Sequence, residues 1–120
     1  MQTTERAKLL SRLADLAPEN FEALALDVFR FQAAENPLFA RFLNLLGKNP
    51  AAVQNLEAVP FLPISLFKNY TVKTGTWTAE TEFTSSATTG QIPSRHPVRN
   101  LNFYLENTRR GFAQAYGDPA

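Results

Sequence analysis

Residues 83–96 of the chain read Phe-Thr-Ser-Ser-Ala-Thr-Thr-Gly-Gln-Ile-Pro-Ser-Arg-His. A run of hydroxyl-bearing and small residues in this stretch follows a predicted strand at 81–84 and closes at Gly90. Small side chains let backbone N–H groups converge on an anion, and serine and threonine hydroxyls add further donors. Gly90 can adopt a positive φ, and Arg95 can offer the anion a bidentate charge. The pattern therefore predicts a phosphate-binding loop formed by Ser85, Ser86, Ala87, Thr88, Thr89, Gly90 and Arg95.

The same composition is also typical of a solvated loop or a flexible linker. The Walker pattern Gly-x-x-x-x-Gly-Lys-Ser/Thr, which would identify a different class of phosphate loop, is absent. On the pattern alone, a linker and a phosphate loop both remain open.

The first half of the chain, residues 1–58, has the apolar periodicity of helices separated by prolines. Leucines recur at helical spacing from Leu9 to Leu16, and Pro18 then stands where the first turn of a second helix tolerates it. We expect the apolar stripe of this second helix to consist of Phe21, Leu24, Val28 and Phe31, with Ala25 and Phe29 beside it.

Two asparagine–proline pairs mark the starts of the next helices. Asn36-Pro37 combines an N-cap with a first-turn proline, and the helix that follows is expected to end at Gly47. Asn49-Pro50 repeats this start and predicts a shorter helix that includes Val53 and Leu56. Three or four helices are therefore expected before residue 58.

The second half of the chain has a different character. Residues 59–97 are expected to form a buried connector that ends in one helical turn, then a short β-hairpin, and then the phosphate loop. The first strand of this hairpin is expected around Val72, and the second at 81–84. An amphipathic helix is predicted over residues 98–117. The fold class is therefore α/β, with residues 1–120 as one domain of a longer protein, because a single hairpin is marginal unless it packs on something larger.

Composition narrows the class of protein further. A hydrophobic fraction of 44% and a net charge of +1 fit a folded domain with no field to attract nucleic acid or anionic lipid. The absence of cysteine excludes disulfides, thiolate metal sites and a cysteine nucleophile within the chain, and a single histidine argues against a metal site. We see no secretory signal and no apolar run of about 20 residues, so we expect a cytoplasmic protein without a membrane span.

Several segments, taken in order along the chain, are similar to one known family, the LuxE-like acyl-protein synthetases of the adenylate-forming superfamily. The residues that carry the resemblance are Glu22-x-x-Ala25-Leu26-x-Val28-Phe29-x-Phe31-Gln32, Asn36-Pro37, Pro60-Phe61-Leu62-Pro63-Ile64-x-x-Phe67-Lys68, Phe83-Thr84-Ser85-Ser86-x-Thr88-Thr89-Gly90-Gln91 and Ser94-Arg95-His96. Because these segments span nearly the whole chain, the resemblance is more specific than the Ser/Thr loop alone, and it favours the phosphate loop over the linker.

The resemblance implies an ATP-dependent activation of a fatty acid carboxylate, with Mg²⁺, to an acyl-adenylate. The acyl group would then pass to a cysteine thiol of the synthetase and from there to a partner protein. An acyl-donor or reductase protein is the implied partner. Members of the family are several times longer than this chain, and most of their adenine and acyl site lies downstream of the matched region. We therefore expect the N-terminal part of such an enzyme, in the form of a partial adenylate-forming domain, and no ligase activity from this piece alone.

The sequence departs from the family in two places. Ala87 stands where the family loop has glycine, which weakens the loop if that position needs a positive φ. Arg95 is the nearest cation after the loop, whereas the wider superfamily commonly has a lysine directly after the loop's proline. Two other functions remain open: a non-catalytic helical interaction module, and a relative that ligates an aryl acid to coenzyme A.

Overall fold

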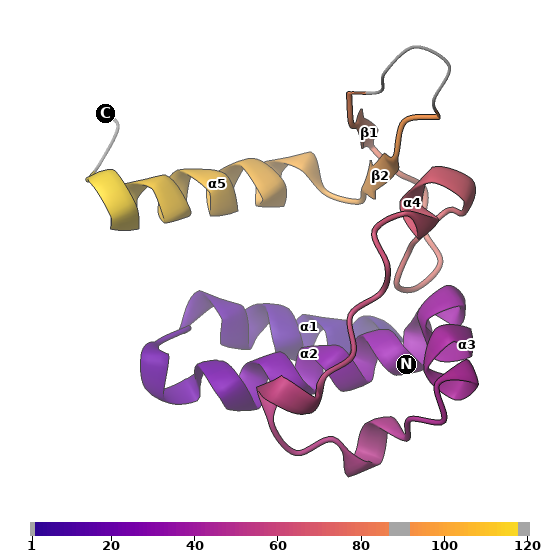
Figure 1. Cartoon of the computed structure of the whole chain (residues 1–120). Helices are drawn as coiled ribbons and strands as arrows, with labels where there is room; N and C mark the ends of the chain where they lie inside the picture. The colour runs from indigo at the N-terminus through magenta and orange to yellow at the C-terminus, as the bar shows by residue number, and fades with distance from the viewer. Residues whose placement is uncertain (1, 87–91, 118–120) are drawn as a thin grey trace. The chain divides into compact units, whose positions relative to one another are not determined.

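The computed structural model describes residues 2–86 and 92–117, which form a helical part and a part that contains a β-hairpin (Figure 1). The chain divides into two compact units. The first unit comprises Met1–Pro63 and Lys73–Gly75, and the second comprises Ile64–Val72 and Thr76–Ala120. This mixed helix-rich fold with one antiparallel hairpin confirms the predicted α/β class at its coarse level.

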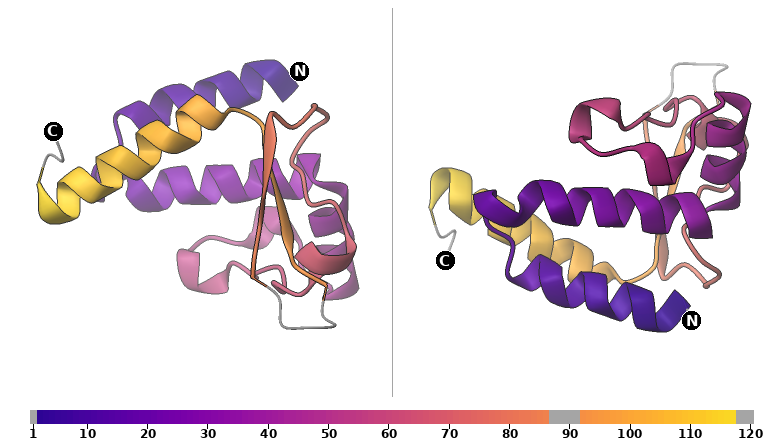
Figure 2. Two further views of the ribbon diagram at one scale, coloured as in Figure 1. Left: turned by 90° about the horizontal axis from the view of Figure 1, so that it is seen from above. Right: turned by 90° about the horizontal axis from the view of Figure 1, so that it is seen from below.

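The first unit is built on three α-helices, of which the third begins at Pro37 as the Asn36-Pro37 pair predicted. These helices are α1 (Gln2–Ala14), α2 (Phe21–Glu35) and α3 (Pro37–Leu45), and a 3-10 turn at Pro18–Asn20 precedes α2. Figure 2 shows α1 and α2 side by side. Past the end of α3, Gly47 adopts a φ of 70°, as expected of a glycine that terminates a helix.

The core of the first unit lies between α2, α3 and the segment that follows α3. Phe29 and Phe39 meet edge to face, with ring centroids 5.8 Å apart. The buried residues of this core are Leu26, Phe29, Ala33, Phe39, Leu43 and Val53. The predicted stripe on α2 was wrong in part, because Phe21 is exposed whereas Leu26 and Ala33 are buried. Since α2 packs against α1 as well as α3, its buried surface covers more than one narrow stripe.

The predicted helix after Asn49-Pro50 is replaced by two separate 3-10 turns, Pro50–Ala52 and Leu56–Ala58. Each turn has its own cap, because Asn49 Oδ1 accepts from Ala51 N–H and Asn55 Oδ1 accepts from Ala58 N–H. Between them the backbone of Val53 is extended, and its side chain is buried in the core. The predicted helix is therefore interrupted at Val53, which lies between the two turns.

The connector after the second turn ends in one helical turn, α4 (Leu66–Asn69), as predicted. Its predicted burial was wrong, since Phe61 is 83% exposed and Ile64 is also exposed. Prolines at positions 60 and 63 keep this segment out of regular structure.

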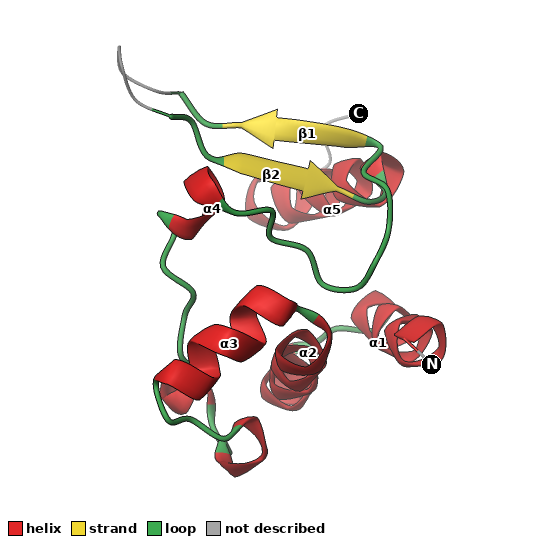
Figure 3. Cartoon of the chain, turned by 90° about the vertical axis from the view of Figure 1, so that its right-hand side faces the viewer, coloured by secondary structure: helices red, strands yellow, loops and turns green. Residues whose placement is uncertain are grey.

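The hairpin of the second unit pairs β1 (Thr81–Thr84) with β2 (Arg95–Val98), as the opposed arrows in Figure 3 show. The predicted strand around Val72 was wrong, and the strand at 81–84 has a different partner from the one expected. The residues just after Val72 belong to the first unit, where Gly75 N–H donates to the carbonyl of Glu35, so they do not pair with β1.

The pairing register of β1 and β2 determines which side chains share a face of the hairpin. Paired residues of an antiparallel ladder share a face, and the next pair faces the opposite way. Phe83 and His96 form one pair, and the adjacent pair of Thr84 and Arg95 lies on the other face. On the first of these faces, Phe83 contacts Tyr104 of the long helix α5 (Leu101–Tyr116), with ring centroids 5.0 Å apart. The predicted C-terminal helix is confirmed, with Asn100 as its N-cap and Gly117 at its end.

The buried N-cap of α3 provides a test of the helical unit. Asn36 is 6% exposed, and its Oδ1 accepts from Phe39 N–H at 3.1 Å. Replacing Asn36 with alanine should lower the free energy of unfolding by about 1–2 kcal/mol, because a buried N–H then lacks its acceptor. Urea unfolding followed by circular dichroism measures this change. Asn49→Ala, at an exposed cap, is the control, and an equal loss in both variants would contradict the assigned role of burial.

Candidate functional site

The candidate site is the segment that joins the two strands of the hairpin. Ser85 directly follows β1 and Ser94 directly precedes β2, and Ser85 N–H donates to the Ser94 carbonyl at 3.0 Å. This bond extends the strand ladder by one pair towards the Ser/Thr run. Of the predicted loop residues, Ser85 and Ser86 are described and exposed, whereas Ala87, Thr88, Thr89 and Gly90 lie outside the described residues.

A polar network of side chains closes the base of this segment. Ser94 is 6% exposed, and its backbone N–H donates to Ser85 Oγ at 2.9 Å. A regular ladder would direct this N–H to the Ser85 carbonyl, so the Ser85 hydroxyl takes the place of a backbone acceptor. The hydroxyls of Ser94 and Ser85 are also hydrogen-bonded, with 2.7 Å between their oxygens.

The network continues from Ser94 to His96, whose Nε2 lies 3.0 Å from Ser94 Oγ. The imidazole is stacked on the ring of Phe67 in α4, with centroids 4.6 Å apart and planes 30° apart. Because α4 contacts β2, the ring of His96 is fixed by packing on one side and by Ser94 on the other. Every polar atom that is buried among the described side chains has a hydrogen-bond partner.

Arg95 lies on the opposite face of the hairpin from this network. It pairs with Thr84 across the ladder and is exposed. Among the described residues no carboxylate forms an ion pair with it. The guanidinium is therefore not committed to any described acidic group, and its donors are available for an anion.

The described part of the segment suits an anion better than a metal ion. Ser85 and Ser86 offer hydroxyls, and Arg95 offers a guanidinium from the face opposite Ser85; each of these groups can donate to a phosphate oxygen. Within residues 2–86 and 92–117, no three histidine or carboxylate side chains gather closely enough to hold a metal ion. No described residue is therefore assigned to Mg²⁺.

Ser85 was predicted from its place in the Ser/Thr run, whereas Ser94 and His96 entered only as part of the family resemblance, without a role in the site. Neither residue belongs to a run of chemically similar neighbours. Their connection to Ser85 arises because β2 is the partner of β1, a pairing that the sequence did not predict. A signal is visible in retrospect: Ser94 and His96 are two residues apart, which places both side chains on one face of a strand.

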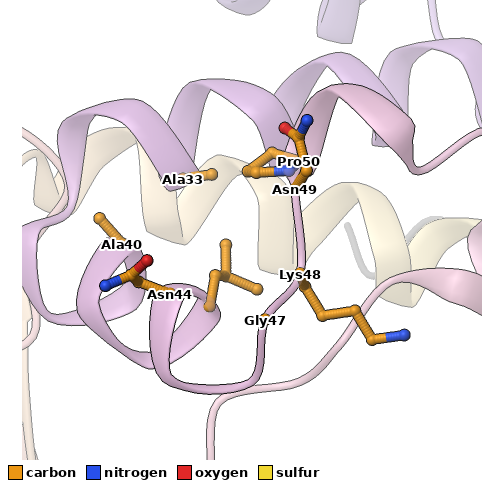
Figure 4. Close-up of a pocket in the computed structure, with 8 residues that line it drawn as sticks. Ala33, Ala40, Asn44, Gly47, Lys48, Asn49 and Pro50 are labelled. Atoms are coloured by element: carbon orange, nitrogen blue, oxygen red, sulfur yellow. The ribbon is translucent and has the colours of Figure 1, made fainter.

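The first unit contains a groove beside Leu43, with a volume of about 510 Å³ (Figure 4). Small side chains line it at Ala33 and Ala40, and Asn44 adds an amide. Lys48 is the one titratable group among its lining residues, and Figure 4 shows the side chain extending away from the two alanines. The groove lacks the convergent polar groups of a catalytic site, so the hairpin is the stronger candidate.

Comparison with known proteins gives no relative: no family model, no curated protein and no solved structure matches this chain. None of the helices in the described residues has both the length and the apolar character needed to cross a membrane.

Proposed function

We propose that this chain is the N-terminal part of an ATP-dependent acyl-protein synthetase, in which the segment between β1 and β2 binds the phosphates of ATP. The observation that carries the proposal is the hairpin itself. Ser85 is held at the base of the Ser/Thr segment, Ser86 is exposed beside it, and Arg95 is exposed at the start of the returning strand. The resemblance to LuxE-like synthetases, which this segment carries in part, supports the same assignment.

In this proposal the chain supplies the donors that hold the leaving phosphates. The hydroxyls of Ser85 and Ser86 and the guanidinium of Arg95 contact phosphate oxygens, and the loop residues Ala87, Thr88, Thr89 and Gly90 add backbone amides. Such donors stabilise the negative charge that grows on the phosphates as a carboxylate attacks ATP. The chain has no cysteine, so the thiol that accepts the acyl group belongs to another part of the enzyme or to a partner.

The remaining features of the proposed enzyme follow from the resemblance. Its substrate is a fatty acid or another carboxylate, its cofactors are ATP and Mg²⁺, and an acyl-donor or reductase protein is its partner in the cytoplasm. An aryl-acid ligase that transfers to coenzyme A would use the same phosphate loop and differ in the acid and the acceptor. The titration described below tests the phosphate site that both enzymes share.

One observation favours a second function, that of a non-catalytic interaction module. None of the residues of α5 is buried, and its apolar surface carries exposed large side chains. The exposed residues are Phe103, Tyr104, Leu105, Phe112 and Tyr116. A module that binds a protein through this surface would not need to bind phosphate at the hairpin. A measurement of phosphate binding therefore distinguishes the two functions.

Ala87 provides a direct test of the proposed function. If the loop position requires a positive φ, an L-residue there costs about 1 kcal/mol, so Ala87→Gly should strengthen the binding of pyrophosphate about fivefold. Isothermal titration calorimetry of the unmodified chain and the variant measures both affinities. Ala34→Gly in α2 is a matched control and should leave the affinity unchanged. If neither the chain nor the Ala87 variant binds pyrophosphate, the proposed function is wrong.

A further inference from the structure

We propose that His96, Ser94 and Ser85 form a directional hydrogen-bond relay that makes the Ser85 hydroxyl a dedicated donor to an anionic oxygen. The inference deepens the proposed function and rests on it in one respect, since the anion is taken to be a phosphate. It adds two residues, Ser94 and His96, that would act on the ligand through Ser85. We regard them as positioning residues.

The hydrogen-bonding capacity of Ser85 determines what its hydroxyl can offer a ligand. A serine hydroxyl has one proton to donate and two lone pairs that accept. Ser94 N–H, a group that only donates, occupies one of these lone pairs at 2.9 Å. In the relay the Ser94 hydroxyl, whose oxygen lies 2.7 Å from Ser85 Oγ, donates to the other. The Ser85 proton is then the single remaining group, so the hydroxyl faces any ligand as a donor.

The direction of the relay also specifies which ring nitrogen of His96 carries a proton. In the relay the single hydroxyl proton of Ser94 is directed to Ser85, 2.7 Å away. The 3.0 Å contact between Ser94 Oγ and His96 Nε2 is then donated by the ring, so the proposal requires a proton on Nε2. If the ring were protonated only on Nδ1, Ser94 would donate to His96, Ser85 would donate to Ser94, and the outward group of Ser85 would be a lone pair. The tautomer of His96 thus decides whether Ser85 attracts or repels an anion.

Packing and strand pairing hold the side chains of the relay in place. The chain of hydrogen bonds runs from the half-buried residue His96, through the buried Ser94, to the exposed residue Ser85. Phe67 holds the ring by stacking, and the strand pairing of Phe83 with His96 fixes the backbone from which the ring projects. Hydrogen bonds that are shielded from water polarise one another, so the alignment reaches the exposed end.

The tautomer can be measured directly because His96 is the only histidine in the chain. Nitrogen NMR of the neutral imidazole distinguishes a protonated Nε2 from a protonated Nδ1. The relay predicts a protonated Nε2 in the free chain and in the presence of pyrophosphate. A ring protonated on Nδ1 would overturn the relay, whatever the chain binds.

Variants test the link between the relay and the ligand. Ser85→Ala should weaken pyrophosphate binding about tenfold, because a hydrogen bond to a charged group is lost. Ser94→Ala should weaken it about fivefold, because the Ser85 proton is no longer directed outward. The double variant should bind like Ser85→Ala alone, since Ser94 acts only through Ser85. Losses that multiply in the double variant would overturn the relay.

Substitutions at His96 separate positioning from packing. His96→Phe keeps a ring for Phe67 to stack on but removes the donor, and it should weaken binding about fivefold. His96→Gln places an amide near the position of Nε2 and should restore binding to within about twofold. Equal losses in the two variants would contradict a donor role. Ser11→Ala, on an exposed face of α1, is the control variant and should change nothing.

The outcomes also distinguish the relay from the proposed function. If the unmodified chain does not bind pyrophosphate, the proposed function fails, and with it the anion as the ligand of Ser85. If the chain binds pyrophosphate and the Ser94 and His96 variants bind equally well, the phosphate site stands and the relay is wrong.

Discussion

Replacing Leu43 with alanine is expected to lower the free energy of unfolding of the helical unit by about 3 kcal/mol. Leu43 is 1% exposed and lies in the core with Leu26, Phe29 and Phe39. Its truncation removes apolar surface from the core and leaves a cavity that its neighbours fill only in part. The groove beside Leu43 allows some relaxation, which keeps the expected loss in the middle of the range for buried leucines.

Urea unfolding followed by the helical circular dichroism signal measures this loss. The matched control is Leu45→Ala, two residues further along α3, because Leu45 is 78% exposed. Its expected change is within about 0.5 kcal/mol. If the two leucines gave the same loss, the face of α3 that we assign to the core would be wrong.

The second large effect is expected from Arg95→Glu, which should weaken pyrophosphate binding about a hundredfold. The substitution removes the exposed guanidinium beside the Ser/Thr segment and sets a negative charge against a negative ligand. The loss includes a charge-assisted hydrogen bond and a new repulsion, so it should exceed the effect of any single hydroxyl.

Arg109→Glu controls for the change in net charge. Arg109 is exposed on α5 and pairs with Glu106, and its reversal alters the total charge by the same amount. At about 0.15 M salt, screening confines the effect of an exposed charge to about 8 Å, so this variant should bind almost normally. Calorimetry at that salt concentration compares the two. Equal weakening in both would show that the ligand responds to net charge and not to a site at Arg95.

Local signals in the sequence predicted the limits of α3 and α5 well. Asn36 and Pro37 gave the start of α3, Gly47 its end, and Asn100 and Gly117 the limits of α5. These positions were predictable because caps and terminators act within a few residues of the backbone groups that they satisfy. The apolar face of α2 was harder to identify, because that helix is covered by both α1 and α3.

Strand pairing was the main failure of sequence reasoning. The pairing of β1 with β2 joins residues on either side of the Ser/Thr run, and β2 contains Pro97, although proline is depleted from the interior of sheets. Pro97 pairs with Glu82, whereas the neighbouring pair of Phe83 and His96 lies between it and the base of the loop. A proline is tolerated there because its missing N–H falls at a position where the ladder does not require a donor.

The residues of the candidate site also differ in whether the sequence alone could identify them. The composition of the Ser/Thr run indicated Ser85, Ser86 and Arg95 as anion ligands, since the required chemistry is a property of the residues themselves. The role of Ser94 and His96 depends on which strand lies beside Ser85, and that is a property of the fold. Correct strand pairing would therefore have been needed to find them.

The most direct test of the account is a titration of the chain with MgATP, followed by two-dimensional amide NMR. The account predicts saturable shifts at Ser85, Ser86, Ser94 and Arg95, with little change in α1, α2 or α3. Pyrophosphate should compete for the same site and reverse the shifts produced by ATP. Absence of shifts at the hairpin, or shifts confined to α5, would contradict a phosphate site between β1 and β2 and favour the interaction module.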